Sequence, residues 1–192
     1  MPRKTLIRNM IFLLLLMACS FAASGQEILQ IDPAASEIHF TLSDVLHTVR
    51  GTFKLTEGSL QLRRSAGEMR GRIVVGSATG ESGNNSRDHR MSESELLAQK
   101  YPHIVFEPDH FTGALAASGK SSIMVSGIFT LLGTGHPITV PMQVEATGDH
   151  YMATGSFTVP YVAWGLKDPS SFVLRVGKEV QIELKLTATL KH

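Results

Sequence analysis

The sequence predicts an all-β fold, an antiparallel barrel of about eight strands with a single helix across one end. Three observations predict it. From Gln26 onward apolar and polar residues alternate with a period of two, which is typical of half-buried strands. Glycine-containing turns separate these runs at hairpin intervals, a spacing that favours a sandwich or a barrel. Glycines inside the strands, such as Gly51 and Gly127, favour the barrel because its corners bend sharply.

The strands follow one another along most of the chain. In each, one face is apolar and is expected to point into the fold. The clearest strands are expected at 36–42, 49–56, 123–131, 138–144, 151–159 and 180–190.

One segment breaks the alternation. Between Asn84 and Lys100 the apolar residues return at near-helical spacing among good helix formers, which predicts a helix at about 86–100. The Tyr101-Pro102 pair is expected to end it, because a residue before proline avoids helical dihedrals. The chain shows no repeats or linkers, so we expect a single domain over 26–192.

The first residues predict export. A basic start at 3–8 precedes an apolar run at 10–18 and small residues at 22–25, the pattern of a secretory signal peptide over 1–25. The run is too short for a transmembrane span, so we expect a periplasmic or secreted protein. A second interpretation stays open, because the residues around Cys19 resemble a lipobox, which would make Cys19 a lipidated anchor.

Charge and cysteine content exclude several classes of function. The chain has 18 Lys+Arg and 17 Asp+Glu; without Arg3, Lys4 and Arg8 the basic residues fall to 18 − 3 = 15, a net charge near −2. No basic surface for nucleic acid is expected. With Cys19 as the one cysteine, disulfides and thiol catalysis in the domain are excluded.

Eight histidines are scattered over the chain without metal-ligand spacing, so no metal site and no cofactor are predicted. The densest charged cluster is Arg87-Asp88-His89-Arg90. Asn85, Ser86 or Asp88 could cap the helix there, which is one interpretation. The other is that Arg87 and Arg90 hold the polar head group of a ligand, since an arginine fork pairs well with phosphate or carboxylate. No motif points to an enzyme.

The apolar strand faces allow two interpretations. A barrel of about eight strands is either filled by side chains or holds one small ligand. Trp164 lies in an elaborate segment at 159–171, where it could plug the barrel end or line an opening. If the barrel is hollow, the residues expected along an apolar channel are Phe40, Val49, Phe53, Ile123, Val125, Phe129, Val140, Phe157 and Trp164.

Several motifs together resemble the YceI-like family. They are the stretches 31–40 (IDPAASEIHF), 47–53 (HTVRGTF), Arg87-Asp88 with 100–106 (KYPHIVF), and 126–140 (SGIFTLLGTGHPITV). The resemblance spans about 28–190. The helical region and the segment 164–170 depart from the family pattern, which indicates a divergent branch.

The resemblance implies a lipocalin-like barrel around a long apolar channel. It also implies an exported, non-catalytic protein that binds a long-chain isoprenoid, such as an isoprenoid quinone or a polyprenyl lipid, or another amphiphile. The competing hypothesis is an envelope stress or assembly protein with a filled barrel and no small ligand. The sequence leaves the oligomeric state open, a dimer included.

Overall fold

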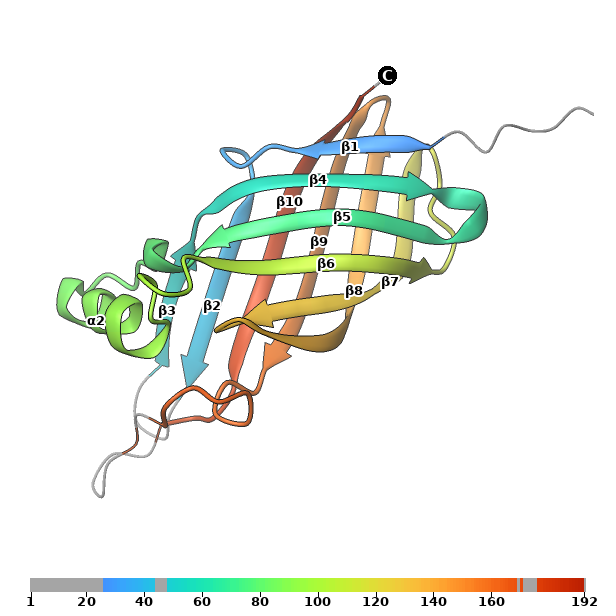
Figure 1. Ribbon diagram of the computed structural model, residues 1–192. Coiled ribbons are helices and arrows are strands. Elements are labelled where there is room, and N and C mark those ends of the chain that lie inside the picture. Colours follow the sequence, from blue (N-terminus) through green and yellow to red (C-terminus); the bar gives the residue numbers. More distant parts are fainter. Residues whose placement is uncertain (1–25, 44–47, 169, 171–175, 192) are drawn as a thin grey trace, which may run out of the picture.

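The structure is a computed structural model that describes residues 26–43, 48–168, 170 and 176–191 (Figure 1). The predicted signal peptide, the Cys19 lipobox and the choice of cleavage position lie outside these residues. Ten strands form one antiparallel sheet. They are β1 (Glu27–Ile31), β2 (Glu37–Ser43), β3 (Thr48–Phe53), β4 (Leu55–Arg63), β5 (Glu68–Gly76), β6 (His103–Thr112), β7 (Gly119–Leu131), β8 (Thr134–Thr147), β9 (His150–Val159) and β10 (Val180–Lys191).

Eight of the strands close into a barrel. The order β1-β4-β5-β6-β7-β8-β9-β10 is completed by pairing of β10 with β1. This confirms the predicted antiparallel barrel. In Figure 1 β4, β5 and β6 cross β2, β9 and β10 at a steep angle, as expected for facing walls of a barrel.

The two further strands widen one end of the barrel. The long strand β10 pairs with β1 through Ala188–Lys191 and with β2 through Gln181–Lys185. β3 then pairs with β2. A single bridge between Thr52 and Glu81 joins β3 to the segment that follows β5. Along one edge of β10 the neighbouring strand is therefore β1 at one end of the barrel and β2 at the other.

The predicted helix is present but shorter than expected. α2 (Asn85–Arg90) continues into a π-helical turn, η3 (Met91–Glu95). The N–H of Leu96 donates to the carbonyl of Met91 at 2.8 Å, and Leu97 adopts a left-handed φ of 47°, which stops the helix before Tyr101-Pro102. Two 3₁₀ turns, η1 (Arg64–Ala66) and η2 (Ser77–Thr79), complete the fold.

The cap of this helix is not one of the residues expected from the sequence. The side chain of Asn84 accepts the N–H of Arg87 at 3.0 Å. Asp88 instead accepts from the N–H and hydroxyl of Ser82, which fixes the preceding loop. The sequence favours Asn85, Ser86 or Asp88 because residues of all these types cap helices well. Which of the neighbouring residues becomes the cap depends on the conformation of the loop. Among the residues described, no helix has the length and apolarity needed to cross a membrane.

Candidate functional site

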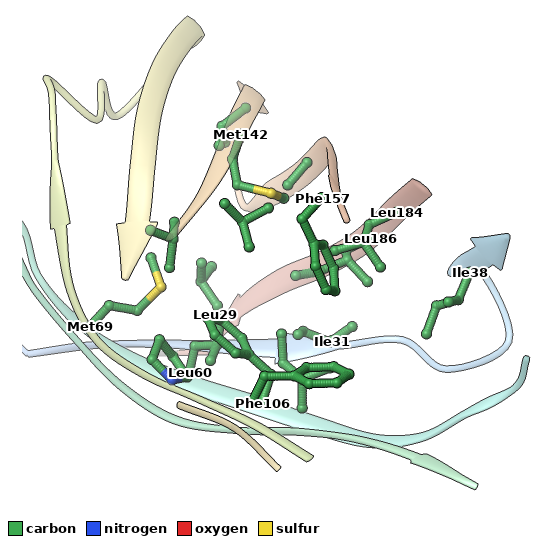
Figure 2. Close-up of a pocket in the computed structure, with 18 of the residues that line it drawn as sticks. Leu29, Ile31, Ile38, Leu60, Met69, Phe106, Met142, Phe157, Leu184 and Leu186 are labelled. Atoms are coloured by element: carbon green, nitrogen blue, oxygen red, sulfur yellow. The ribbon is translucent and has the colours of Figure 1, made fainter. Parts of the chain in front are cut away.

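The barrel encloses an apolar cavity of about 170 Å³ (Figure 2). Its wall comes from inward-facing residues of all ten strands, and among the described lining residues Tyr151 is the one whose side chain carries an oxygen or nitrogen. The wall includes Leu29, Ile31, Ile38, Phe53, Ile73, Phe106, Ile123, Phe129, Ile138, Val140, Met142, Phe157, Leu184 and Leu186.

The strand period produces this wall. In β8 every second residue from His136 to Ala146 is at least partly buried while its neighbours are exposed, as expected for a strand with one face inside. Close approach between strands also shapes the cavity. Gly155 on β9 pairs with Met142 on β8, and a Cβ at Gly155 would lie 2.3 Å from the Met142 sulfur. Because Gly155 has no side chain, the Met142 side chain can occupy this space.

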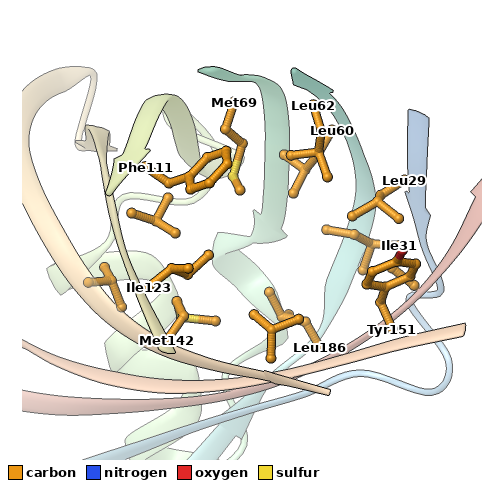
Figure 3. Close-up of a cluster of buried hydrophobic side chains, with 14 of the residues drawn as sticks. Leu29, Ile31, Leu60, Leu62, Met69, Phe111, Ile123, Met142, Tyr151 and Leu186 are labelled. Atoms are coloured by element: carbon orange, nitrogen blue, oxygen red, sulfur yellow. The ribbon is translucent and has the colours of Figure 1, made fainter. Parts of the chain in front are cut away.

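One half of the barrel is tightly packed. Leu62, Met69, Phe111 and Ala146 belong to one buried apolar cluster. Figure 3 shows Leu62, Met69 and Phe111 pointing into the barrel. Each of them is at most 6% exposed, and of the four only Met69 lines the cavity, so the core continues beyond the cavity wall at this end.

A polar cluster covers the packed end. The guanidinium of Arg64 donates to Glu27 from Nε at 2.9 Å and from Nη2 at 2.7 Å. Its Nη2 also donates to the Tyr151 hydroxyl at 2.8 Å, and Nη1 donates to the carbonyls of Leu115 and Ala116. The hydrogen bonds with Glu27 raise the pKa of Arg64, although burial opposes this shift. Arg64 therefore stays charged and joins the ends of several strands.

The opposite end is closed by a second apolar cluster. Leu96, after the helix, packs with Leu131 and Val159 from the ends of β7 and β9 and with Tyr161 from the turn that follows β9. The Tyr161 hydroxyl donates to the carbonyl of Gly177 at 2.6 Å. Burial raises the pKa of Tyr161, and the negative charges of Asp168 and Glu95 raise it further.

Trp164 links this second cluster to the cavity. Its indole lies parallel to the imidazole of His136, with ring centroids 4.1 Å apart and planes 5° apart. It also contacts Phe129, with centroids 5.8 Å apart, and Phe129 meets Phe157 edge to face at 5.6 Å. Phe129 and Phe157 line the cavity, so the aromatic chain runs from its wall to the loop after β9.

The barrel wall is split between β8 and β9 at this end. Their described pairing starts at the hairpin, Thr147 with His150, and stops at Met142 with Gly155. In this two-residue hairpin the backbone groups of odd-numbered β8 residues face β9. Pro137 and Pro141 both occupy such positions, so each lacks an N–H on the side where β9 turns away. We call this split, with β8 at 134–141 on one side and β9 at 156–159 on the other, the β8–β9 seam.

Comparison with known families identifies the chain. Residues 29–188 match the profile of the YceI-like domain. The chain belongs to the YceI-like family. No curated protein gives a significant match.

Solved structures share the fold of this YceI-like chain. BcnA of Burkholderia cenocepacia is 21% identical with a TM-score of 0.70, over 83% of this chain and 99% of that one. A polyisoprenoid-binding domain from Saccharophagus degradans, implicated in plant cell wall breakdown, is 16% identical with a TM-score of 0.64, over 85% and 98%. The YceI protein of Campylobacter jejuni is 13% identical with a TM-score of 0.62, over 77% and 88%.

Six of the nine channel residues expected from the sequence lie on the cavity wall of this YceI-like barrel. They are Phe53, Ile123, Val125, Phe129, Val140 and Phe157. The other three lie elsewhere, each for a reason of packing.

Phe40 is buried against Gly51, where an added Cβ would meet its ring at 2.5 Å, and against Phe53. Val49 pairs with Leu42 in the strands that extend beyond the cavity. Trp164 lies outside the wall behind Phe129.

The two arginines proposed for a head group have partners in the protein. Arg87 donates to the Ser82 hydroxyl at 2.7 Å and to its carbonyl at 2.9 Å. Arg90 lies 3.5 Å from the carboxylate of Glu95. Arg87 therefore fastens the helical segment of this YceI-like chain to the loop before it, and Arg90 links α2 to η3. Within the described ranges no group of three or more histidine, cysteine or acidic side chains is placed to hold a metal ion.

The sequence analysis missed a large part of the wall. Ile73 and Val75 of β5 and Ile104 and Phe106 of β6 line the cavity. Their strands contain register shifts, which obscure the alternation that revealed the other strands. The stretches 73–75 and 104–106 are rich in β-branched and aromatic residues, and this was the signal available to find them.

Proposed function

We propose that this protein binds the hydrocarbon chain of a long-chain isoprenoid, or of another amphiphilic lipid, in the barrel cavity and does not transform it. The observation that carries the proposal is the apolar wall, which offers Tyr151 as its one polar side chain. Such a wall binds a lipid tail by removing apolar surface from water, about 25 cal/mol for each Å². The fold shared with the polyisoprenoid-binding domain of Saccharophagus degradans supports the same class of ligand.

The cavity volume sets the part of the ligand that enters. A cavity of about 170 Å³ is close to the roughly 150 Å³ of an engineered apolar cavity that binds benzene. Benzene has six carbon atoms and an isoprene unit has five, so the cavity in its present shape accommodates about one isoprene unit. A longer chain requires the wall to yield, and Met69 and Met142 are suited to this because methionine repacks easily.

The cellular location forms part of the proposal. The signal-like residues 1–25 support export, so that the barrel would meet its ligand in the periplasm or outside the cell. An isoprenoid quinone or a polyprenyl lipid fits the proposed site as a ligand, with its polar head at one end of the cavity.

The test is direct lipid extraction. Protein purified from a bacterial host is expected to release a long-chain lipid into organic solvent, detected by mass spectrometry. Ala153→Phe places a ring in the cavity, since Ala153 lines it, and should lower the lipid content several-fold.

Thr154→Phe is the matched control. Thr154 is the next residue on β9 and faces solvent, so the same ring is added outside the barrel and the lipid content should stay unchanged. Wild-type protein that is empty after purification and takes up no added isoprenoid would overturn the proposed function.

A further inference from the structure

His136 ends the row of β8 side chains that faces into the barrel. In β8 the burial pattern alternates without interruption from His136 to Ala146. Ile138, Val140 and Met142 of this row line the cavity. Because strand side chains point to the same face at every second position, His136 shares that face and lies directly beyond Ile138.

The Nε2 atom of His136 has no partner in this position. Among the residues that the structure describes, it is the one buried side-chain nitrogen or oxygen without a hydrogen bond. Buried polar atoms nearly always have a partner, and an exception calls for a ligand, an ion or a water. The imidazole cannot turn freely toward solvent, because it is stacked on Trp164 with centroids 4.1 Å apart.

His136 does not itself line the cavity in this shape, but its strand neighbours Ile138 and Phe129 do. Trp164 contacts Phe129, which lines the cavity, and His136 pairs with Phe129 across β7 and β8. His136 also belongs to the β8 part of the β8–β9 seam, where β9 supplies no pairing. A tail lying against Ile138 would bring the next group of the ligand to His136.

We propose that Nε2 of His136 is the hydrogen-bonding contact for the polar head of the bound lipid, and that this head is a neutral hydroxyl or carbonyl oxygen. A neutral imidazole nitrogen donates to a carbonyl in one tautomer and accepts from a hydroxyl in the other. The assignment rests on the proposed function and names the chemistry of the ligand that the cavity alone does not define.

A neutral head fits this end of the barrel better than a phosphate. Phosphate recognition uses arginine forks or lysines. Arg87 already donates to Ser82, and Arg90 lies against Glu95. Among the described residues the histidines in ion pairs are His39, His89 and His110, so His136 brings no charged partner of its own to a phosphate.

The experiment compares three short probes whose tails have about two isoprene units, so that the tail fills the cavity and the head group lies at its end. They are geraniol, the hydrocarbon myrcene and geranyl phosphate. Each is titrated into delipidated wild-type protein and into His136→Phe, which keeps an aromatic ring against Trp164 but removes the nitrogen. Geraniol should bind about tenfold more weakly to His136→Phe, the usual scale for one hydrogen bond to a buried group, while myrcene binding stays within about twofold.

Stability of the empty protein supplies an independent measurement. His136→Phe removes a buried atom without a partner, so the thermal midpoint of the delipidated variant should equal or exceed that of the wild type. His150→Phe, at an exposed position of β9, is the matched control and should change neither binding nor the midpoint.

Three results would overturn the assignment while leaving the proposed function intact. They are equal weakening of geraniol and myrcene, unchanged geraniol binding, and geranyl phosphate binding that is tighter than geraniol binding and insensitive to the variant. Wild-type protein that binds none of the probes would overturn the proposed function itself, and this assignment with it.

Discussion

Arg64 holds Glu27 through two nitrogens, with Nε 2.9 Å and Nη2 2.7 Å from the carboxylate oxygens. Glu27 begins β1, and Arg64 directly follows the end of β4. Because the two strands pair antiparallel, both residues lie at the same rim of the barrel. Their side chains are 18% and 31% exposed. Removal of one partner would leave the other charge partly buried, which is costly.

We therefore expect Arg64→Ala to lower the free energy of unfolding by about 2–3 kcal/mol, less than for a fully buried pair because some solvent reaches it. Urea unfolding measures this. Arg63→Ala is the control, because Arg63 pairs with Glu68 at the surface with 46% and 37% exposure, and it should cost at most about 1 kcal/mol. Equal effects of the two substitutions would contradict the structural role of Arg64.

Gly155→Ala should strain the cavity wall. The new Cβ would lie 2.3 Å from the Met142 sulfur and 2.7 Å from the Pro141 carbonyl, and overpacking of this kind costs about 1–3 kcal/mol. Adding Met142→Ala should recover part of the loss in Gly155→Ala, although alone it destabilises by opening a void. The unfolding free energies of the wild type, the two single variants and the double variant give the coupling energy between the two positions. Strictly additive effects would show that the two side chains do not contact each other.

Substitution by glycine at two neighbouring leucines should change the free energy of unfolding in opposite directions. Leu97 has a left-handed φ of 47° and is 40% exposed, so Leu97→Gly should relieve strain and raise the unfolding free energy by about 0.5–1 kcal/mol. Leu96 is 7% exposed in the second cluster, and Leu96→Gly should cost about 3–5 kcal/mol. A loss of stability in Leu97→Gly would contradict the strained conformation.

Tyr161 should make the fold sensitive to alkali. Burial, with Asp168 and Glu95, raises its pKa above the ordinary 10.0, so the folded state favours the neutral phenol. This contribution is fully present below pH about 10 and is lost as the pH rises through the folded pKa. The unfolding free energy of the wild type should fall more steeply above pH 10 than that of Tyr161→Phe, which loses the hydrogen bond to Gly177 but cannot ionise. Parallel slopes would exclude this role.

The sequence predicted the barrel and most of the inward positions, because a period of two decides which face a side chain takes regardless of its distant neighbours. It could not predict which inward residues border empty space. Phe40 has the alternation of an inward-facing residue, but its ring packs over Gly51 and not along the cavity. This contact depends on the register of β2 with β3.

Functional detail that depends on tertiary contacts was also inaccessible. Arg63 and Arg64 are adjacent and identical in type, and only the 3₁₀ turn η1 directs Arg64 toward Glu27. Similarly, the sequence drew attention to Arg87 and Arg90 because charged clusters stand out, whereas His136 was one histidine among eight. Its stacking on Trp164 brings together a strand and a loop that are far apart in the chain.

Pro137 and Pro141 have a consequence beyond the shape of the seam. A bare strand margin normally invites an extended segment of another molecule to add to the sheet, which is a route to fibrils. At these two places the ring nitrogen has no hydrogen to offer an incoming strand. The unpaired stretch of β8 is therefore protected against recruiting a second chain at high protein concentration.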